Sequence, residues 1–382
     1  EIAQCLVGSE MCIRDRYYPC LTSVLSWLSA RYTLVFITSI APDFPLLGLG
    51  AAAGAETVLG PECMSLAMFY MCCAYAVNAL SPKLAGKLQV STTIIKLIPL
   101  FLMAIVGIVV GIANGTLANN FNTLADVGTT STSPLFASVC ATAFAYEGWI
   151  IATSINAELK DAKKNLPRAL VIGAIIIIAT YIFYYVGVAG GATNQELIDS
   201  GATVAFINVF GNVLGNILNL FIAISCIGTM NGLMLGCVRG LYSIAVRGRG
   251  PAPHVFSQID KETNMPHNSA IVGLLLCGFW GLYFFLANLA GTWSGPFVFD
   301  SSELPIITIY MLYLPIFVMW IKKATDETAM RRYVLPLLAI CGSLFMIYAS
   351  IMGHGIACFW YLIVFAAVMA VGFAFSKEKP IN

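Results

Sequence analysis

The sequence predicts an all-α, polytopic membrane protein with about ten transmembrane helices. Of the 382 residues, 59% are hydrophobic and only 10% are Asp, Glu, Lys or Arg, whereas a soluble globular chain carries roughly 25% charged residues. Apolar runs of about 20 residues, the length that crosses the hydrocarbon core of a bilayer, recur along the chain. A chain this poor in charge cannot cover a globular surface, so most of its surface must face the lipid bilayer.

Composition also disfavours several kinds of partner. The formal net charge is +1 and no basic stripe is present, so nucleic acid is not an expected partner. The three histidines are scattered, and no CxxC pair occurs among the twelve cysteines. The cysteines therefore read as small packing residues, and the sequence predicts neither a metal site nor another cofactor.

Ten apolar runs define the predicted spans. They lie at about 18–41, 62–81, 88–112, 134–156, 168–190, 213–238, 269–290, 302–321, 333–351 and 355–376. The loops at 42–61, 113–133, 191–203, 291–301 and 352–354 contain no Lys or Arg, whereas the alternate loops are basic. The positive-inside rule places the basic loops and both termini in the cytoplasm of a cell with this protein in its plasma membrane.

The run at 204–246 is long enough for two spans, and the loop charges decide between the alternatives. Two spans there would place Arg247, Arg249 and Lys261 outside the cell and invert every later helix. We therefore predict a single span in this region.

The first sixteen residues differ from the rest of the chain. The string SEMCIRDR at 9–16 resembles the conceptual translation of a transposon-end sequencing adaptor, although a natural polar N-terminus is the alternative. We expect residues 1–16 to be a non-native, adaptor-derived segment and residues 17–382 to form a single transmembrane domain.

Glu147 is the main candidate for chemistry in the fourth span, where Gly148 follows it directly. An unpaired carboxylate at that depth costs roughly 2.5 to 3.5 kcal/mol on insertion scales. Membrane proteins tolerate such a charge where a broken helix lines a cavity, and the freed backbone groups can then hold the charged groups of a zwitterion. The alternative is a protonated Glu147 that is hydrogen-bonded to a neighbouring helix.

Lys96 and Arg31 are basic residues inside predicted spans. Lys96 lies eight residues into the third span, about 12 Å deep at about 1.5 Å per residue. It either snorkels toward the cytoplasm or occupies an ion site, where a proton cycling on the amine replaces a coupling cation. Arg31 either faces a cavity or packs against neighbouring helices.

The sixth span combines a glycine pattern with two hydroxyl residues. Its glycines recur every four residues and favour close helix packing; they are Gly228, Gly232, Gly236 and Gly240. Ser225 and Thr229 lie beside this stripe and could supply oxygen ligands to an ion site.

Two blocks of the sequence resemble the amino acid–polyamine–organocation (APC) superfamily, most closely its L-type amino acid transporter branch. The first is FAYEGWIIATSINAELKDAKKNLPRAL at 144–170, which is similar to the family's broken sixth helix and the loop after it. The second, at 225–270, begins SCIGTMNGLMLGCVRG and is similar to the eighth helix and its loop.

The resemblance implies the leucine-transporter fold, with twelve helices in two inverted repeats. The ten spans would correspond to helices three to twelve, so the resemblance also implies that the first two helices are absent. We then expect this stretch by itself not to transport.

The resemblance carries roles over to matching residues. Phe144 resembles the aromatic gate above the substrate, whereas Ala145, Tyr146, Glu147 and Gly148 match the unwound stretch whose backbone binds the substrate's amino group. Lys96 matches the lysine that stands in the place of sodium in proton-linked relatives. The sequence departs from the family at Glu147, which is often a small or polar residue there, and at Ile150, which is usually Asn in L-type members.

These implications favour secondary active transport of amino acids by alternating access, either as proton-coupled symport or as exchange for a second amino acid. Because Glu147 adds a carboxylate, an antiporter of polyamines or cationic amino acids is an alternative. A receptor of the same fold that binds amino acids without transporting them is another. An enzyme is not expected, since no nucleophile–base pair occurs in the spans.

Overall fold

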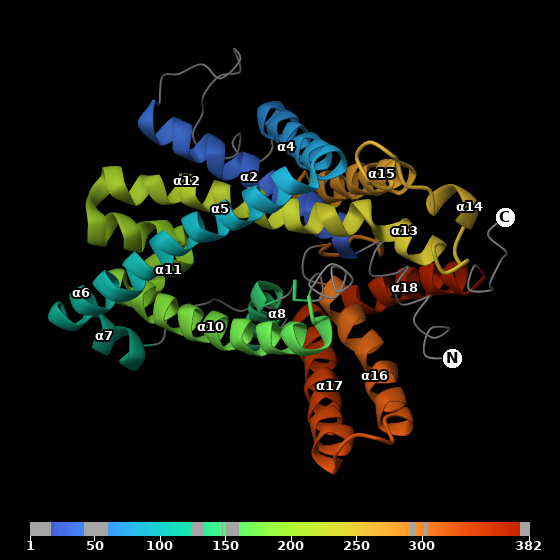
Figure 1. Cartoon of the computed structure of the whole chain (residues 1–382). Helices are drawn as coiled ribbons and strands as arrows, with labels where there is room; N and C mark the ends of the chain where they lie inside the picture. The colour runs from blue at the N-terminus through green and yellow to red at the C-terminus, as the bar shows by residue number, and fades with distance from the viewer. Residues whose placement is uncertain are drawn as a thin grey trace.

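The computed structural model describes residues 17–41, 60–123, 133–146, 148–149, 160–290, 295–301 and 304–374 (Figure 1). Within these ranges the regular structure is helical, with no strand. The first half forms α2 (Tyr18–Ile40), α4 (Pro61–Leu80), α5 (Pro82–Leu102), the π-helical segment η2 (Met103–Gly107), α6 (Ile108–Ala113), α7 (Thr116–Asn122) and α8 (Pro134–Tyr146). The second half forms α10 (Ala162–Gly191), α11 (Asn194–Ser200), α12 (Ala202–Val238), α13 (Gly240–Ala245), α14 (Pro253–Phe256), α15 (His267–Tyr283), η4 (Phe284–Leu289), α16 (Pro305–Lys323), η5 (Met330–Val334), α17 (Leu335–His354) and α18 (Ile356–Ala374).

Eight helical segments in the described ranges are long and apolar enough to cross a membrane. The other two predicted spans correspond to shorter apolar helices, Pro134–Tyr146 and Ile356–Gly372. The lipid-facing character of the surface is clear on α10, where Ile172, Ile175 and Phe183 are each more than half exposed. Large apolar side chains that gather along one helix surface are typical of a surface that meets hydrocarbon.

The run at 204–246 forms one candidate span, as predicted, and it contains a sharp bend. Gly211 has φ 80° and ψ 170°, values that interrupt α12. Glycine adopts a positive φ without a steric penalty. The chain turns back at this point, so that Gly215 packs against Ile207, and the bend is visible at the left end of α12 in Figure 1. The part of α12 after Gly211 agrees with the predicted span at 213–238.

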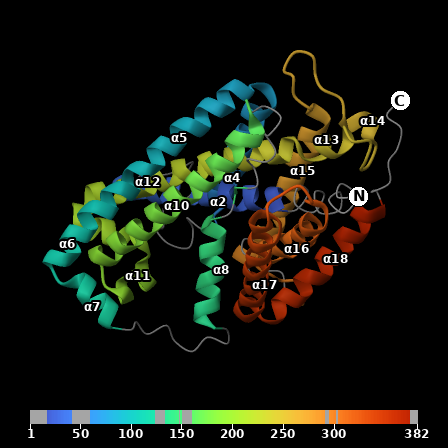
Figure 2. The ribbon, with the colours of Figure 1, turned by 60° about the horizontal axis from the view of Figure 1, so that its bottom comes forward.

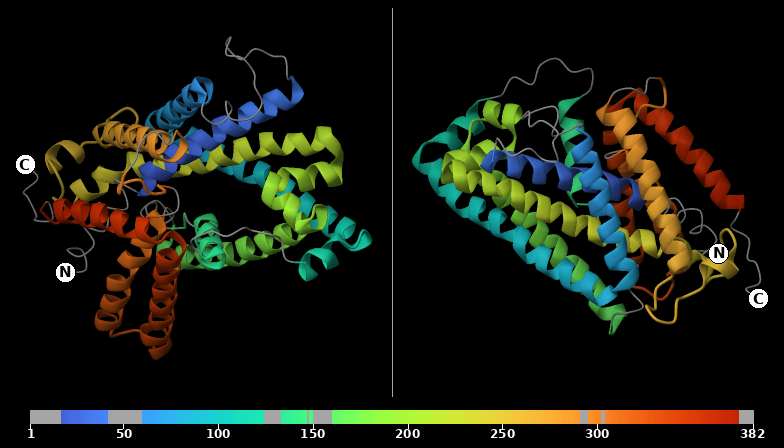
Figure 3. Two further views of the ribbon diagram at one scale, coloured as in Figure 1. Left: turned by 180° about the vertical axis from the view of Figure 1, so that it is seen from behind. Right: turned by 90° about the horizontal axis from the view of Figure 1, so that it is seen from above.

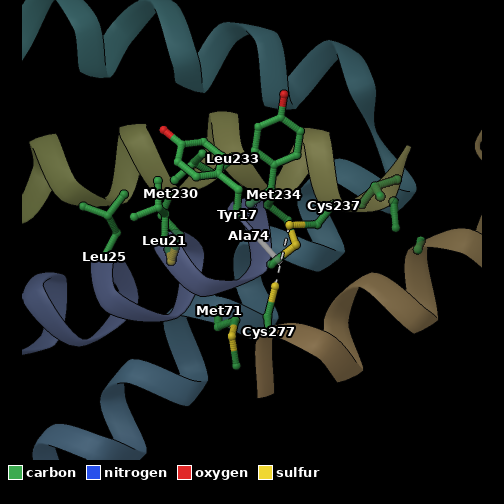
Figure 4. Packing of buried hydrophobic residues seen from close by; sticks show 14 of the residues in the cluster. Tyr17, Leu21, Leu25, Met71, Ala74, Met230, Leu233, Met234, Cys237 and Cys277 are labelled. Atoms are coloured by element: carbon green, nitrogen blue, oxygen red, sulfur yellow. Dashed lines mark hydrogen bonds between the residues drawn. The ribbon is translucent and has the colours of Figure 1, made fainter. Parts of the chain in front are cut away.

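The main hydrophobic core lies where α12 packs along α2, flanked by α4 and α15. Figure 4 shows Leu21 and Leu25 of α2 facing Met230 and Met234 of α12, with Met71 of α4 below them. The view from above in Figure 3 shows α2 running beside α12. This arrangement buries most of α2, the helix in which the described part of the chain begins.

Glycines on α12 allow its neighbours to approach closely, as their spacing predicts. A Cβ at Gly228 would overlap Thr92 of α5, and a Cβ at Gly236 would overlap the ring of Tyr18 in α2. The same principle joins α10 to η2, where a Cβ at Gly187 would overlap the backbone carbonyl of Met103. Small residues at such contacts are the usual basis of helix association in membranes.

The helix α8 belongs to a different part of the molecule. It packs on α17, where the rings of Phe136 and Tyr348 are 5.3 Å apart and nearly perpendicular. The Cys140 thiol also lies 3.6 Å from the Ser350 hydroxyl of α17. In Figure 2, α8 stands between the group that contains α10 and α12 and the group formed by α16, α17 and α18.

Candidate functional site

The helix α8 ends inside the predicted fourth span. Its last residue is Tyr146, and Gly148 lies in a turn with φ +107°. Side chains other than glycine rarely adopt this φ. Glu147 and residues 150–159 lie outside the described residues. The last carbonyl groups of a helix have no partner within the helix, so an end at this point places backbone acceptors at the depth that the sequence predicts for an interruption.

Aromatic side chains from two other helices, α10 and α16, pack at this helix end. The Tyr181 hydroxyl of α10 donates a 3.2 Å hydrogen bond to the carbonyl of Ala145. The Tyr181 ring also packs against Tyr146 with centroids 5.1 Å apart. The ring centroids of Trp149 and Tyr313 of α16 are 5.6 Å apart. Tyr181 and Tyr313 thus join the site, although nothing in their local sequence marks them.

The predicted site residues differ in exposure. Phe144 is half-buried and packs against the main core, and Tyr146 and Gly148 are also half-buried. Ala145 is exposed. The helix end is therefore anchored on one side by Phe144 and remains accessible at Ala145, which suits a site that receives a small ligand.

Lys96 lies on α5 opposite α12. The two helices run antiparallel, because Gln89 lies beside Gly232 whereas Thr92, further along α5, lies beside Gly228. Lys96 follows one turn later and interacts electrostatically with Cys226. The structure thus brings Lys96 to the level of Ser225 on the facing helix.

The second hydroxyl residue on α12 is differently placed. Thr229 is exposed, and its hydroxyl donates a 2.9 Å hydrogen bond to the carbonyl of Ser225 within the same helix. Among the described residues, no hydrogen bond or ring contact that the structure shows joins Lys96 to residues 144–149.

A buried polar network that joins α4, α5 and α12 was not predicted from the sequence. The amide nitrogen of Asn78 in α4 donates a 2.9 Å hydrogen bond to the side-chain oxygen of Asn231 in α12. Asn231 in turn donates to Gln89 of α5 over 3.3 Å. Asn78 and Asn231 are 1% and 3% exposed, and buried polar groups of this kind hold helices in a defined arrangement when they are paired.

An interrupted helix among membrane-spanning helices is the arrangement by which secondary transporters bind their substrates. The described helices define a multi-pass membrane protein, and the family comparison places it in the transporter class. The chain belongs to the amino acid permease family of the APC superfamily, whose sequence model matches residues 17–375. The family resemblance drawn from the sequence is confirmed.

Three relatives show the extent of the similarity. The serine/threonine exchanger SteT of Bacillus subtilis (strain 168) is 26% identical over 341 residues, which are 86% of this chain and 72% of that protein. The mouse Asc-type amino acid transporter 1 is 29% identical over 265 residues, 68% of this chain and 46% of that protein. The human cystine/glutamate transporter is 25% identical over 257 residues, 66% of this chain and 47% of that protein. The chain spans about half the length of these two mammalian relatives. All three relatives are transporters, so the chain belongs with transporters and not with enzymes.

Proposed function

We propose that the protein is a secondary active transporter that moves amino acids across the plasma membrane by alternating access. The observation that carries this proposal is the end of α8 at Tyr146, followed by the positive φ of Gly148, inside a predicted span. The relatives are transporters of amino acids, and one of them is a serine/threonine exchanger. These names favour an amino acid as the substrate, and exchange or proton-coupled symport as the mode of transport.

The proposed substrate site consists of Phe144, Ala145, Tyr146, Glu147 and Gly148. The substrate's amino group would be held by the backbone at the end of α8, where carbonyl groups lack helical partners. Phe144, packed against the core, would close over the substrate as an aromatic gate. The rings of Tyr181 and Trp149 border the same helix end and would shape the space for the substrate's side chain.

Lys96, together with Ser225 and Thr229, is the proposed ion-coupling site. A lysine amine that loses and regains a proton could replace a bound cation during the transport cycle. The position of Lys96 opposite Ser225 and Cys226 of α12 supports this role. The glycines of α12 allow α5 to pack closely against it, which brings the lysine near these residues. The proposal places the termini in the cytoplasm.

The test is uptake of radiolabelled amino acids into proteoliposomes that contain the full-length protein. We expect Lys96→Ala to abolish the dependence of uptake on pH while exchange between internal and external amino acid continues. Lys87→Ala, on the exposed part of the same helix, is the matched control and should preserve the pH dependence. If uptake by Lys96→Ala keeps its pH dependence, Lys96 does not couple transport to protons. If the wild type shows no counterflow, the proposal that the protein transports amino acids is wrong.

A further inference from the structure

Four basic residues gather where α16 joins α17, a surface that we name the hairpin end (residues 320–333). Lys322 and Lys323 are the last residues of α16, and Arg331 and Arg332 lie in η5, which leads into α17. Figure 1 shows the two helices side by side, with their connection at the bottom of the view. Lys322 is about 13 Å further along α16 than Tyr313, which borders the site around α8, so the hairpin end is a separate surface.

Two hydrogen bonds hold the two sides of the hairpin end together. The indole N–H of Trp320 donates to the backbone carbonyl of Arg331 at 3.2 Å. The Nε–H of Arg332 donates to the backbone carbonyl of Ile321 at 3.0 Å. The central carbon of the Arg332 guanidinium also lies 5.0 Å from the ring centroid of Tyr333. The basic residues at the end of one helix are therefore held beside those at the start of the next.

The acidic residues of the connection neutralise only part of this charge. Residues 320–333 contain four basic residues and two acidic ones, Asp326 and Glu327. The Glu327 carboxylate lies 3.6 Å from the guanidinium of Arg331, whose side chain is 70% exposed. An ion pair as exposed as this contributes little to stability, so an anionic ligand can replace it. Lys322 is also exposed, and the hairpin end thus presents an accessible positive surface.

Large apolar side chains lie on α17 directly after the basic residues. Leu335, Leu337 and Leu338 are each more than half exposed. Trp320 and Tyr333 flank the basic residues and are 45% and 44% exposed. In membrane proteins, exposed leucines face hydrocarbon, and Trp and Tyr are enriched where hydrocarbon meets the lipid headgroups. This order of side chains places the basic residues at the depth of the headgroups.

We propose that the hairpin end binds the headgroup of an anionic phospholipid, with the acyl chains of that lipid along the exposed leucines of α17. Arginine binds a phosphate group through two parallel N–H donors. A cluster of about four to eight basic residues at the end of a membrane-spanning helix attracts anionic lipids electrostatically. A zwitterionic lipid offers the same phosphate, but its positive headgroup amine would meet the cluster of cations. This inference does not depend on the proposed transport.

The test compares phosphatidylglycerol with phosphatidylcholine of identical acyl chains, using native mass spectrometry of the purified full-length protein. We expect the wild type to retain phosphatidylglycerol in preference to phosphatidylcholine. The double variant Lys322→Gln/Arg331→Gln should lower this preference by about tenfold, because two of the four cations are lost. Lys83→Gln/Lys87→Gln is the matched control, since it removes two exposed charges from α5, and it should keep the preference. Full preference in Lys322→Gln/Arg331→Gln, or an equal loss in both double variants, would overturn the proposal.

Fluorescence quenching of Trp320 locates the lipid without any change of charge. The difference in emission between the wild type and Trp320→Phe isolates this indole. In vesicles, phosphatidylglycerol with brominated acyl chains should quench Trp320 more strongly than brominated phosphatidylcholine at the same mole fraction. Trp360 of α18, isolated in the same way with Trp360→Phe, should be quenched equally by the two lipids.

Equal quenching of Trp320 by the two lipids would contradict the proposal, and this measurement decides the outcome if the double variant does not fold. Glycerol 3-phosphate at millimolar concentration separates a lipid from a soluble phosphate compound. It should leave the stronger quenching by phosphatidylglycerol in place, because it carries no acyl chain to hold it at the leucines. If it abolishes that difference, the ligand is a soluble phosphate compound and the lipid proposal is wrong.

Discussion

Glycine has opposite consequences in the two parts of the molecule. On α12 and α10, Gly228, Gly236 and Gly187 sit where a Cβ would overlap a neighbouring helix, so the missing side chain allows backbones to pack together. At the end of α8, nothing lies within 4 Å of a Cβ at Gly148. There the missing side chain permits a φ of +107°. The first use of glycine stabilises the bundle, and the second permits a turn directly after the end of α8.

The strongest test of this contrast is Gly187→Ala in α10. The new methyl group would overlap the backbone carbonyl of Met103, and backbone cannot rotate away as a flexible side chain can. We expect the free energy of unfolding to fall by about 1 to 3 kcal/mol, measured by denaturation in mixed detergent micelles. Gly173→Ala in the same helix meets no atom within 4 Å and should keep the free energy of unfolding or raise it by up to about 1 kcal/mol, because alanine favours the helix over glycine. Equal losses in both variants would contradict close packing as the cause.

The polar network of Asn78, Asn231 and Gln89 tests how α4, α5 and α12 are held together. Asn231→Leu removes the side-chain oxygen that accepts from Asn78 and the amide that donates to Gln89, whereas the Asn78 amide keeps two backbone carbonyls as acceptors. Since each hydrogen bond contributes about 0.5 to 1.5 kcal/mol, we expect the two losses together to lower the free energy of unfolding by about 1 to 3 kcal/mol. The exposed Asn212 of α12 provides the control, because Asn212→Leu breaks no contact between helices. A neutral result for Asn231→Leu would mean that the network does not hold α4, α5 and α12 together.

Gly148→Ala tests the glycine whose positive φ forms the turn after α8. Because a side chain at positive φ costs about 1 to 2 kcal/mol, the turn after α8 should shift while the bundle stays folded. We expect amino-acid uptake by the full-length protein to fall at least about tenfold, with a change in unfolding free energy of no more than about 2 kcal/mol. Gly342→Ala, in the middle of helix α17 and equally open, should preserve uptake. Normal uptake in Gly148→Ala would show that the backbone conformation after α8 is not needed for transport.

The smallest expected effect lies outside the membrane-spanning helices. The backbone N–H of Thr263 donates to the Asp260 carboxylate at 2.8 Å, and its hydroxyl does so at 3.0 Å. These bonds lower the pKa of the Asp260 carboxyl, with smaller contributions from Glu262 and His267. Since the pKa is lower in the folded state, this stabilisation is present above about pH 4 and is lost as the pH falls through the folded pKa.

Hydrogen exchange of the loop at 257–266 measures this effect. We expect the loop amides to lose protection below about pH 4 in the wild type. Asp260→Asn should remove that dependence, because the carboxylate no longer titrates, whereas Glu262→Gln should keep it. A pH dependence that survives in Asp260→Asn would assign it to another group.

The sequence by itself determined the helical membrane class, the order of the spans and the single span at 204–246, whereas the interruption near Gly148 stays a prediction. These features depend on hydrophobicity, loop charge and glycine placement, which act over one or two helical turns and are therefore visible locally. The glycine stripe was also readable, because its four-residue period follows from helix geometry.

Only the tertiary structure decided which side chains meet. Asn78 and Asn231 are 153 residues apart in sequence, and Tyr181 reaches Ala145 across 36 residues. Arg31 had two open interpretations, and the structure places its guanidinium carbon 5.5 Å from the ring centroid of Trp27 in the same helix. Such contacts depend on how helices rotate and pack against each other. No local pattern encodes that rotation, since each helix exposes several faces that satisfy the same hydrophobic requirement.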